Sequence, residues 1–513
     1  MIEALEPDNQ WDQTFICDLL AQVDHSGVHV LIIPGRYWFD KIDEINNRLQ
    51  DKPNVLVVIT GDEEALFDTS QLEHPNMRIC VQSPHLHDRR KADMWLPIGY
   101  TPGIRDPKSR PGKSLRWFFA GQNTHKRRNE CVEVLRQIEG GALFPTKSFN
   151  EGLEHDDYLD IMFSAVAVPC PSGAVIPDTF RLYEALEAGC VPLADGFDPK
   201  MGSQGYWRYL FDTNDIPFPI IEDWGDAPGT INYVNDIFPT FNNRVFGWWQ
   251  QQKRLLRLRL QKEIAMLGVP YHEDTTVLVA TSPISGHPTT KMLEETIKSI
   301  RFHLPEVEIL VMFDGVRPEQ EHYRTRYEKY KENALWWINQ QLNITPILFE
   351  EHQHQARMTR ATLKQVTTPT IMFVEHDTPL VTDCDIEFDK IQKLISDNKA
   401  DVVRLHHEAR IHPDHEHLMV DSEPQNGFLR TAQWSQRPHV ANTDYYRMLL
   451  ANIHEDSKTM IEDAIHGLTQ TKWLEQGYPG WNEHRIWIYA PEANLKRSYH
   501  LDGRGNDPKY EMT

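Results

Sequence analysis

The chain has 513 residues, of which 40% are hydrophobic, and 53 Lys and Arg stand against 75 Asp and Glu, a formal net charge of −22. A chain of this length is expected to fold into two or three domains with sizeable cores. Its acidic balance opposes long-range attraction to nucleic acid or to anionic lipid, which disfavours DNA as a partner without excluding a local basic groove.

The cysteines indicate a reducing compartment, and the hydropathy indicates a protein without a membrane span. The six cysteines are scattered and form no CxxC motif, a pattern typical of buried free thiols. No uninterrupted apolar run approaches the roughly 18 residues of a membrane-spanning helix, and the acidic start at Met1-Ile2-Glu3 does not resemble a signal peptide. We therefore expect no membrane span and a cytoplasmic location.

Apolar runs alternate with helical patterns along the first half of the chain, which favours an α/β fold with mainly parallel sheets. The runs are VHVLIIPG, NVLVVITGD, MRICVQSP, LRWFFAGQ, VAVPCPSG and VPLADG. Residues 101–114 are rich in Pro, Gly and charge, as linkers are. We predict one Rossmann-like subdomain over 1–110 and a second over 111–268, the latter ending in a long helix over roughly 246–267.

A second series of strand-like runs begins near Thr275, with TTVLVATSPI, VEILVMFDG, ITPILFEEH and TPTIMFVEHDTPL. This restart predicts an independent nucleotide-binding domain over 269–513. The fold prediction is therefore α/β with tandem Rossmann-like nucleotide-binding modules. The His-rich stretch from His406 to His417 is too irregular for a zinc site and is predicted to be a polar loop.

The stretch around residues 166–196 predicts a strand, a turn at Ser172-Gly173, a helix with Arg181 and Glu184, and a further strand. Ligands of open parallel sheets bind beyond the carboxyl ends of the strands. Backbone N–H groups of Ser172 and Gly173 are thus candidates to hold phosphate, and Glu184 is a candidate to bind ribose hydroxyls. An ordinary strand–helix–strand unit without a ligand is the alternative.

The motifs of this stretch resemble the sugar-nucleotide half of exostosin-like glycosyltransferases, which have the GT-B architecture. The matching motifs are Pro171-Ser172-Gly173, Arg181, Glu184-Ala185-Leu186 and Gly189-Cys190-Val191-Pro192, with WFFAGQNTHKRR and ADMWLPIGYTP upstream, so that the resemblance covers about residues 90–200. The resemblance implies that Arg127 or Arg128 touches the donor diphosphate, that Arg181 lies nearby and that Glu184 binds the ribose.

The region before the linker has only about 100 residues, which is short for the acceptor-side domain where this family keeps its catalytic base. Its candidates for a base follow strand ends; they are Asp62, Glu63, His85 and His87. A first half that binds a donor without turning it over therefore stays an alternative.

In the second half, a strongly apolar strand ends in Glu375-His376-Asp377. Carboxylates at i and i+2 point the same way and can hold Mn²⁺ or Mg²⁺ against a diphosphate. The alternative is an acidic loop after a strand.

This half resembles GT-A glycosyltransferases, in which a DxD-like motif binds the metal, although Glu stands first here. The resemblance implies Glu375, Asp377 and His500 as metal ligands and Mn²⁺ or Mg²⁺ as cofactor. It also implies nucleoside binding by Thr281 and Asp314, and contact with the donor phosphates by Arg360, with Arg357 as a second candidate.

The sequence KTMIEDAIHG resembles the Glu-Asp pair at a helix start in inverting GT-A enzymes, which assigns Asp463 as the base that deprotonates the acceptor hydroxyl. The alternative is a pair of helix-N-terminal acids favoured by the helix dipole. The sequence also offers candidates for an acceptor wall, in which flat rings would stack on sugars: Trp434, Gln436, Arg437 and His439.

These predictions combine into a two-module glycosyltransferase, with an exostosin-like GT-B half and an inverting, metal-dependent GT-A half. It would transfer hexosyl or pentosyl groups from nucleotide-sugar donors to hydroxyl acceptors of a growing glycan. Two alternatives remain open: a phage-type glycosyltransferase acting on hydroxymethylated DNA bases, and a sugar-nucleotide-binding scaffold with an inactive GT-B half.

Overall fold

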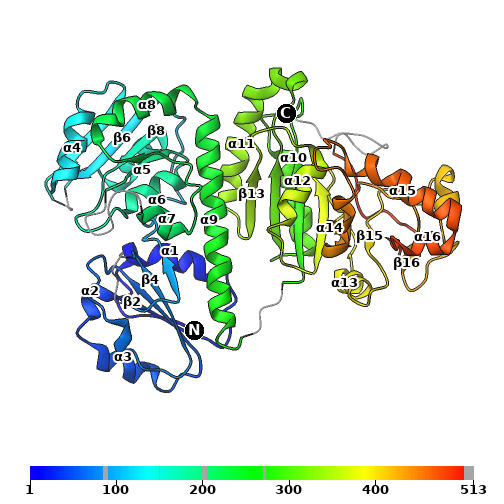
Figure 1. The fold of residues 1–513 in the computed structure, drawn as a ribbon, viewed down its shortest axis with the longest axis horizontal. Helices are drawn as coiled ribbons and strands as arrows, with labels where there is room; N and C mark the ends of the chain where they lie inside the picture. Colours follow the sequence, from blue (N-terminus) through cyan, green and yellow to red (C-terminus); the bar gives the residue numbers. More distant parts are fainter. Residues whose placement is uncertain (85–89, 149–150, 198–204, 270–272, 502–513) are drawn as a thin grey trace. The chain divides into compact units, whose positions relative to one another are not determined.

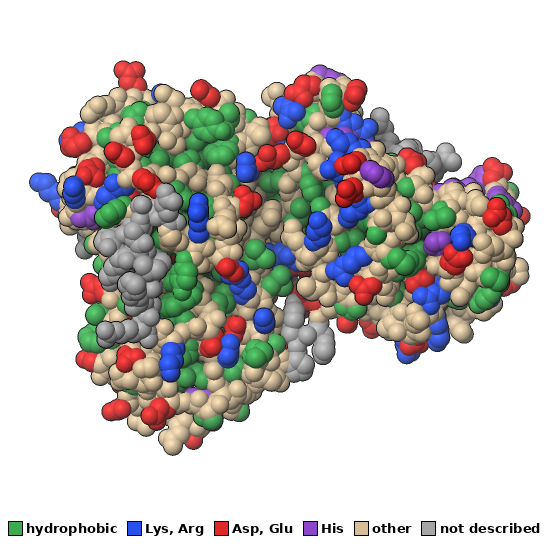
Figure 2. All heavy atoms as spheres, in the orientation of Figure 1, with side chains coloured by type: hydrophobic (Ala, Val, Ile, Leu, Met, Phe, Trp, Pro, Cys, Tyr) green, Lys and Arg blue, Asp and Glu red, His purple; other side chains and the backbone are tan. Residues whose placement is uncertain are grey.

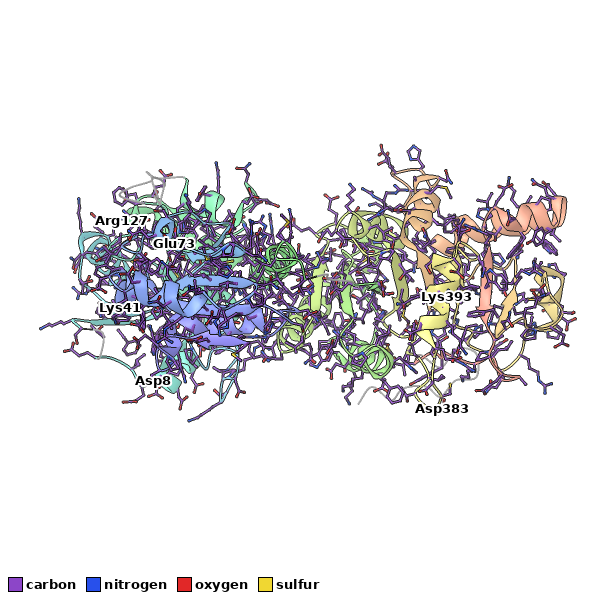
Figure 3. All side chains as sticks on the ribbon, turned by 90° about the horizontal axis from the view of Figure 1, so that it is seen from below. Asp8, Lys41, Glu73, Arg127, Asp383 and Lys393 are labelled. Atoms are coloured by element: carbon purple, nitrogen blue, oxygen red, sulfur yellow. The ribbon has the colours of Figure 1, made fainter. Side chains whose placement is uncertain are left out.

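A computed structural model describes residues 1–84, 90–148, 151–197, 205–269 and 273–501. The chain divides into two compact units, Met1–Tyr271 (unit 1) and His272–Thr513 (unit 2). Both units have exposed charged residues, among them Lys41 and Glu73 of unit 1 and Asp383 and Lys393 of unit 2, which are labelled in Figure 3. Acidic and basic side chains are intermixed on the face in view of each unit (Figure 2).

The first sheet of unit 1 is parallel throughout. Its strands follow the chain order β1 (Ile2–Ala4), β2 (His29–Pro34), β3 (Val55–Thr60), β4 (Met77–Gln82) and β5 (Met94–Leu96). The connecting helices are α1 (Gln10–Leu20), α2 (Gly35–Trp38) and α3 (Ile42–Leu49). Every residue of β2 and β3 is buried, as expected for central strands of a parallel sheet covered on both faces.

The second sheet of unit 1 is also parallel, in the order β10-β9-β8-β6-β7. Its strands are β6 (Leu115–Gln122), β7 (Gly141–Thr146), β8 (Ala165–Cys170), β9 (Val191–Asp195) and β10 (Ile220–Ile221). Its helices are α4 (Lys126–Leu135), α5 (His155–Ser164), α6 (Phe180–Glu187), α7 (Tyr206–Phe211) and α8 (Ala227–Asp236).

Helix α9 (Thr240–Ala265) joins the two sheets of unit 1. It packs against α1 and β5 of the first sheet and against α6 and β9 of the second (Figure 1). The predicted long helix is present, but it begins six residues earlier than predicted, at Thr240 rather than 246. The apolar spacing that marks the helix is clear only in its later turns, whereas its first turns bury Asn242 and Asn243.

Unit 2 contains an eight-stranded mixed sheet in the order β13-β12-β11-β14-β17-β15-β18-β16. The strands are β11 (Thr275–Thr281), β12 (Glu308–Phe313), β13 (Ile344–Leu348), β14 (Thr370–Glu375), β15 (Val402–Arg404), β16 (Phe428–Arg430), β17 (His439–Asn442) and β18 (Ile486–Tyr489). Strand β17 runs antiparallel to both of its neighbours, β14 and β15. Strands β14 and β15 therefore run in the same direction and end at the same edge of the sheet.

Helices cover both faces of this sheet: α10 (Lys291–His303), α11 (Arg324–Asn339), α12 (His354–Leu363), α13 (Phe388–Ser396), α14 (Thr443–Ala451), α15 (Ile461–Gln476) and α16 (Tyr478–Asn482). Alternate residues of β11 enter two separate hydrophobic cores, with Val277 and Val279 in one and Leu278 and Ala280 in the other.

The predicted α/β class with parallel sheets is confirmed, with two sheets in unit 1 and one in unit 2. The sheet of unit 2 departs from a purely parallel one because β16 and β17 run antiparallel to their neighbours. None of the helices in the described ranges has the length and apolar content that crossing a bilayer requires.

Candidate functional site

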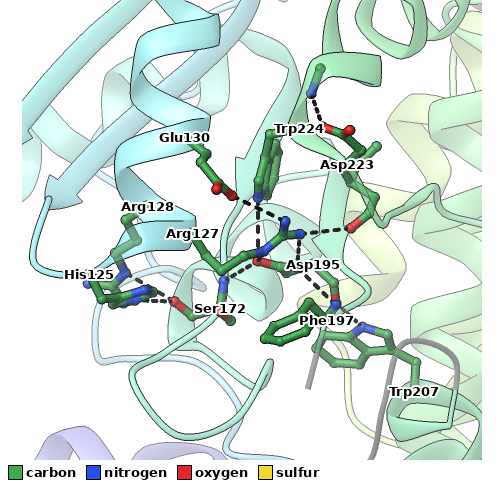
Figure 4. Close-up of polar contacts among 12 residues, drawn as sticks. His125, Arg127, Arg128, Glu130, Ser172, Asp195, Phe197, Trp207, Asp223 and Trp224 are labelled. Carbon is green, nitrogen blue, oxygen red and sulfur yellow. Dashed lines mark hydrogen bonds and ion pairs between the residues drawn. The ribbon is translucent and has the colours of Figure 1, made fainter. Parts of the chain in front are cut away.

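The carboxyl ends of β8 and β9 in unit 1 are joined by the buried carboxylate of Asp195. This carboxylate accepts hydrogen bonds from the backbone N–H of Ser172 at 3.0 Å, from the backbone N–H of Phe197 at 3.0 Å and from the indole of Trp224 at 3.4 Å (Figure 4). Asp195 thus fixes the turn in which Ser172 was expected to hold phosphate.

Arg127, in the first turn of α4, binds the same carboxylate. Its Nε and Nη2 lie 3.2 and 2.5 Å from the two oxygens of Asp195, a two-pronged ion pair (Figure 4). Two of the groups predicted to hold phosphate, Arg127 and the N–H of Ser172, are therefore already engaged by one buried negative charge. A phosphate that used them would have to compete with Asp195.

Arg128 and Arg181 are bound differently, through backbone carbonyls. Arg128 donates to the carbonyl oxygens of Ser172 at 3.1 Å and Gln122 at 3.3 Å, and Arg181 donates twice to that of Ala120, at 3.0 and 2.6 Å. Nη1 of Arg181 is buried without a hydrogen-bond partner in the described part of the chain.

The two guanidiniums influence each other. Burial, together with the positive charge of Arg181, lowers the pKa of Arg128 to about 10. Gly121 has a φ of +144°, and a side chain there would collide with the guanidinium of Arg181. The strand end of β6 therefore leaves room for Arg181, and a neighbouring pair of cations with carbonyl partners favours an anion as ligand.

Glu184 is buried inside unit 1, at 4% exposure. One carboxylate oxygen accepts the hydroxyl of Thr101, and the other accepts the hydroxyl of Tyr158 at 2.6 Å. A ribose hydroxyl would have to take the place of one of these two donors. The N–H of Gly173 is likewise engaged, because it donates to the carbonyl of Ile176 at 2.8 Å.

The candidate bases of the first sheet differ in their roles. The carboxylate of Asp62 accepts the N–H groups of Leu66 and Phe67 and pairs with Arg90 at 3.1 Å, so it organises its own loop. Glu63 faces the other sheet, since a Cβ on Gly173 would lie 3.7 Å from its Oε2. His85 and His87 lie outside the described residues.

Burial raises the pKa of Glu63, while the positive charges of Arg36 and Arg128 oppose that shift. Glu63 therefore lies within electrostatic reach of Arg128 on the second sheet. Of the candidates for a base in the first sheet, it is the one that the described structure brings to the predicted donor-binding turn.

In unit 2, Thr281 and Asp314 follow adjacent strand ends, as predicted. Thr281 ends β11 and is buried. Asp314 follows β12, and its carboxylate accepts the backbone N–H groups of Gln353 at 2.7 Å and His354 at 3.0 Å. His352 Nδ1 lies 2.9 Å from the same carboxylate. Asp314 thus orders the loop that leads into α12.

Arg360 points to the end of another helix. Its Nη2 lies 2.5 Å from the carbonyl oxygens of both Leu450 and Ile453, at the carboxyl end of α14. Such carbonyls have no partner within their own helix, so the guanidinium caps α14. Its predicted contact with donor phosphates would require it to leave this position.

The structure brings together Asp377 and His500, two of the three predicted metal ligands. Oδ2 of Asp377 lies 3.7 Å from Nδ1 of His500, and both side chains are buried. Over the ranges that the structure describes, no group of three or more His, Cys, Asp or Glu side chains is arranged to hold a metal ion. The carboxylate of Asp377 still suits Mn²⁺ or Mg²⁺, and Mg²⁺ is often held by only one or two carboxylates, with water and phosphate completing its shell.

The third predicted ligand, Glu375, accepts a hydrogen bond from Gln355. The side-chain N–H of Gln355 donates to Glu375 at 3.0 Å, and its carbonyl oxygen accepts the backbone N–H of Ile461 at 3.0 Å. Ile461 is the first residue of α15, the helix that carries Glu462 and Asp463. Gln355 therefore ties the start of this helix to the acidic strand end.

The two acids of α15 have different surroundings. Glu462 is partly buried and accepts the backbone N–H of Gln436 at 3.1 Å. Asp463 is exposed, and its negative charge acts on His354, whose pKa is lowered chiefly by burial. Asp463 is thus accessible and lies near the loop ordered by Asp314.

The prediction of an acceptor wall is wrong for its two rings. Trp434 is 1% exposed and His439 is fully buried, with ring centroids 5.5 Å apart, and both pack on Tyr446. Rings within the core present no face to a sugar. His439 begins β17, where it pairs with Phe373 of β14 and Arg404 of β15.

Asp195 and Gln355 were missed by the sequence analysis. Asp195 ends an apolar strand, and the strand-end argument that selected Asp314 could have selected it. No local signal marks Gln355, because its partners are 20 and 106 residues away.

No family model and no curated protein match the sequence. Among solved structures, the chain is similar to residues 1–349 of TarS from S. aureus, with 14% identity over 45% of this chain and 61% of that one, at a TM-score of 0.27. It is similar to the mannosyltransferase PcManGT from Pyrobaculum calidifontis, in complex with GDP-Man and Mn²⁺, with 15% identity over 52% and 66% of the two chains, at 0.29. The chain is also similar to GalNAc-T7 in a structure with UDP, GalNAc and Mn²⁺. The identity is 10% over 46% of this chain and 45% of that one, at a TM-score of 0.30. The chain thus spans 61% of the TarS chain that it matches.

Proposed function

We propose that the chain is a glycosyltransferase with two donor-binding modules, and that unit 2 is an inverting, metal-dependent GT-A-like module. This proposal rests chiefly on the two hydrogen bonds that the side chain of Gln355 makes, one to Glu375 and one to the backbone of Ile461. They connect the acidic strand end at Glu375 with the start of α15, so that Asp463 follows two residues after a backbone group anchored at that strand end.

In this proposal, Asp377 and His500 hold Mn²⁺ or Mg²⁺. Bound there, the ion would supply positive charge to the diphosphate that leaves with the nucleoside. Thr281 and Asp314, at the adjacent ends of β11 and β12, would bind the nucleoside. Glu375 would be held in position by Gln355, which supports a role beside the metal ligands.

Asp463 would take the proton from the acceptor hydroxyl as the sugar carbon is attacked. An alcohol is too weak an acid to ionise at neutral pH, so a positioned carboxylate is needed. Asp463 suits this role because it is exposed to an incoming acceptor and lies in the first turn of α15. Glu462, by contrast, is engaged with the backbone of Gln436.

In unit 1, we propose that a nucleotide diphosphate binds without metal, mainly through Arg128 and Arg181. The two cations are neighbours and bind carbonyls, whereas Arg127 is paired with Asp195. Glu184 would bind the ribose after losing the hydroxyl of Thr101 or Tyr158. Glu63 would face the bound donor from the first sheet.

A second candidate, a scaffold whose unit 1 turns over no donor, is favoured by one observation. Asp195 already fills the anion position between Arg127 and the N–H of Ser172. The DNA-modifying alternative is disfavoured by the net charge of −22.

The test is a panel of nucleotide sugars offered to the full chain with Mn²⁺, with Mg²⁺ and with excess chelator, read by release of the nucleoside diphosphate. We expect release with at least one donor, dependent on the metal, and its loss in Asp377→Ala. Asp383→Ala, which removes an exposed acid from the loop after β14, is the matched control and should keep full release. Release that survives both chelation and Asp377→Ala would contradict the metal-dependent module.

A further inference from the structure

Arg404 is a buried cation that forms no ion pair with a carboxylate among the described residues. It is the last residue of β15 and only 1% exposed. Its Nη1 donates to the backbone carbonyl of Gln433 at 2.9 Å and to the side-chain oxygen of Gln433 at 3.1 Å, while its Nε is buried without a hydrogen-bond partner in the described part of the chain. A buried guanidinium with only neutral partners is costly.

The register of the sheet places Arg404 at the edge that carries the proposed site. His439 of β17 pairs with Phe373 of β14 on one side and with Arg404 of β15 on the other. Strands β14 and β15 run in the same direction, so Arg404 lies level with Phe373, which is two positions before Glu375. The buried cation therefore ends its strand at the same edge as the acidic strand end, two strands away.

Burial and two charged neighbours act on the guanidinium of Arg404. Burial lowers the pKa of Arg404 to about 10, the negative charge of Glu462 opposes that shift, and the positive charge of Arg437 adds to it. His406 lies two residues beyond Arg404, and burial lowers its pKa to about 3, so it is neutral at neutral pH. Among these groups, the carboxylate of Glu462 is the one that offsets the burial of Arg404.

The cluster of Arg404, Arg437 and Gln436 lies on the Asp463 side of the site. Glu462 precedes Asp463 in α15, interacts with Arg404 and accepts the backbone N–H of Gln436. The side-chain amide atoms of Gln436 are buried. Of the groups proposed to hold the donor, Asp377 follows β14 and His500 follows β18. An anion at the cluster would thus belong to the molecule that Asp463 deprotonates.

We propose that Arg404, Arg437 and Gln436 bind an anionic group, a carboxylate or a phosphate, carried by the acceptor. The inference rests on the proposed function, since it takes Asp463 as the group beside the acceptor hydroxyl. The inference specifies the class of acceptor, which is an acidic rather than a neutral glycan. The bound anion would supply the missing partner of Arg404, and its attachment to the sugar would orient the hydroxyl toward Asp463.

The test compares three acceptors with the full chain and an active donor: a methyl hexoside, the matching methyl hexuronide and the matching hexoside 6-phosphate. We expect kcat/KM at least about tenfold higher for one or both acidic acceptors, the scale of a lost charged hydrogen bond. The hexuronide and the 6-phosphate separate carboxylate from phosphate recognition. Arg404→Gln should reduce the ratio of acidic to neutral kcat/KM to near one.

Arg410→Gln, which removes an exposed cation of the following loop, is the matched control and should keep the wild-type ratio. If Arg404→Gln does not fold, the wild-type preference decides the question. Equal or greater use of the neutral hexoside by the wild type, or an unchanged ratio in a folded Arg404→Gln, would overturn the inference.

The proposed function is tested separately, by measuring release of the nucleoside diphosphate from the donor in the absence of any acceptor. If no donor is turned over, calorimetry of the full chain with inorganic phosphate and with glucuronate still tests the cluster. Binding of either anion that is lost in Arg404→Gln and kept in Arg410→Gln would support an anion site. Absence of binding to both anions would overturn it.

Discussion

The side-chain amide of Gln355 lies 3.0 Å from the carboxylate of Glu375 and, through its oxygen, 3.0 Å from the backbone nitrogen of Ile461. One side chain thus connects the end of a central strand with the start of the helix that carries the proposed base. Gln355 is 5% exposed, so neither of its bonds is readily replaced by water.

We predict that Gln355→Met keeps the fold but disturbs the relative position of Glu375 and α15. Methionine matches the length of glutamine and leaves both partners unsatisfied, which should cost about 1–3 kcal/mol of unfolding free energy. Misplacement of reacting groups should lower kcat by about ten- to a hundredfold. Steady-state kinetics check this, with kcat falling more than the donor KM rises.

Gln340→Met, an exposed position at the end of α11, is the control for that substitution and should change neither quantity. A Gln355→Met protein with wild-type kcat would show that the bridge plays no part in turnover.

We predict that Asp463→Asn lowers kcat by about a hundred- to ten-thousandfold, the range attributed to general-base catalysis, because asparagine keeps the shape but cannot accept the proton. Donor binding, measured by calorimetry, should be unchanged. Asp456→Asn removes an exposed acid just before α15 and should be near wild type. A nearly normal rate in Asp463→Asn would place the base elsewhere.

For unit 1, we predict that Arg181→Gln weakens binding of a nucleoside diphosphate by about 1–3 kcal/mol, the scale of a hydrogen bond to a charged group. Calorimetry should be run on the full chain carrying Asp377→Ala, so that unit 2 contributes little. Arg136→Gln, an exposed position at the end of α4, serves as the control. Equal affinity in the two variants would remove Arg181 from the site.

The free energy of unfolding should depend on pH through the buried carboxyl group of Asp178. Asp178 is 1% exposed, accepts the backbone N–H of Ile98 at 3.0 Å and the hydroxyls of Tyr183 and Tyr206, and burial raises its pKa to about 7. The folded state therefore binds a proton that the unfolded state has lost between about pH 4 and pH 7.

The stability that Asp178 contributes is present at about pH 4 and falls as the pH rises through about 7, by at most about 4 kcal/mol. Asp178→Asn should flatten this part of the profile, because asparagine stays neutral. Chemical denaturation between pH 5 and pH 8 measures it. Profiles of the same slope in both proteins would show that Asp178 is ionised in the folded state.

The fold class was readable from the sequence because central parallel strands are continuous apolar runs, and polar residues such as Asp314 and Glu375 stand where those runs stop. The partners of the polar residues were not readable. Arg127 looks like a phosphate ligand until Asp195, 68 residues away, is seen to bind it. Trp434 looks like a surface ring because Arg and Gln surround it in sequence, whereas its neighbours in space are His439 and Tyr446.

The anomeric configuration of the product shows directly whether unit 2 transfers sugar with a carboxylate base opposite the leaving diphosphate. The full chain should be given its active donor, Mn²⁺ and an acceptor, and the product read by proton NMR. Inverting transfer by unit 2 should give a configuration opposite to that of the donor. Retention of the donor's configuration would contradict it.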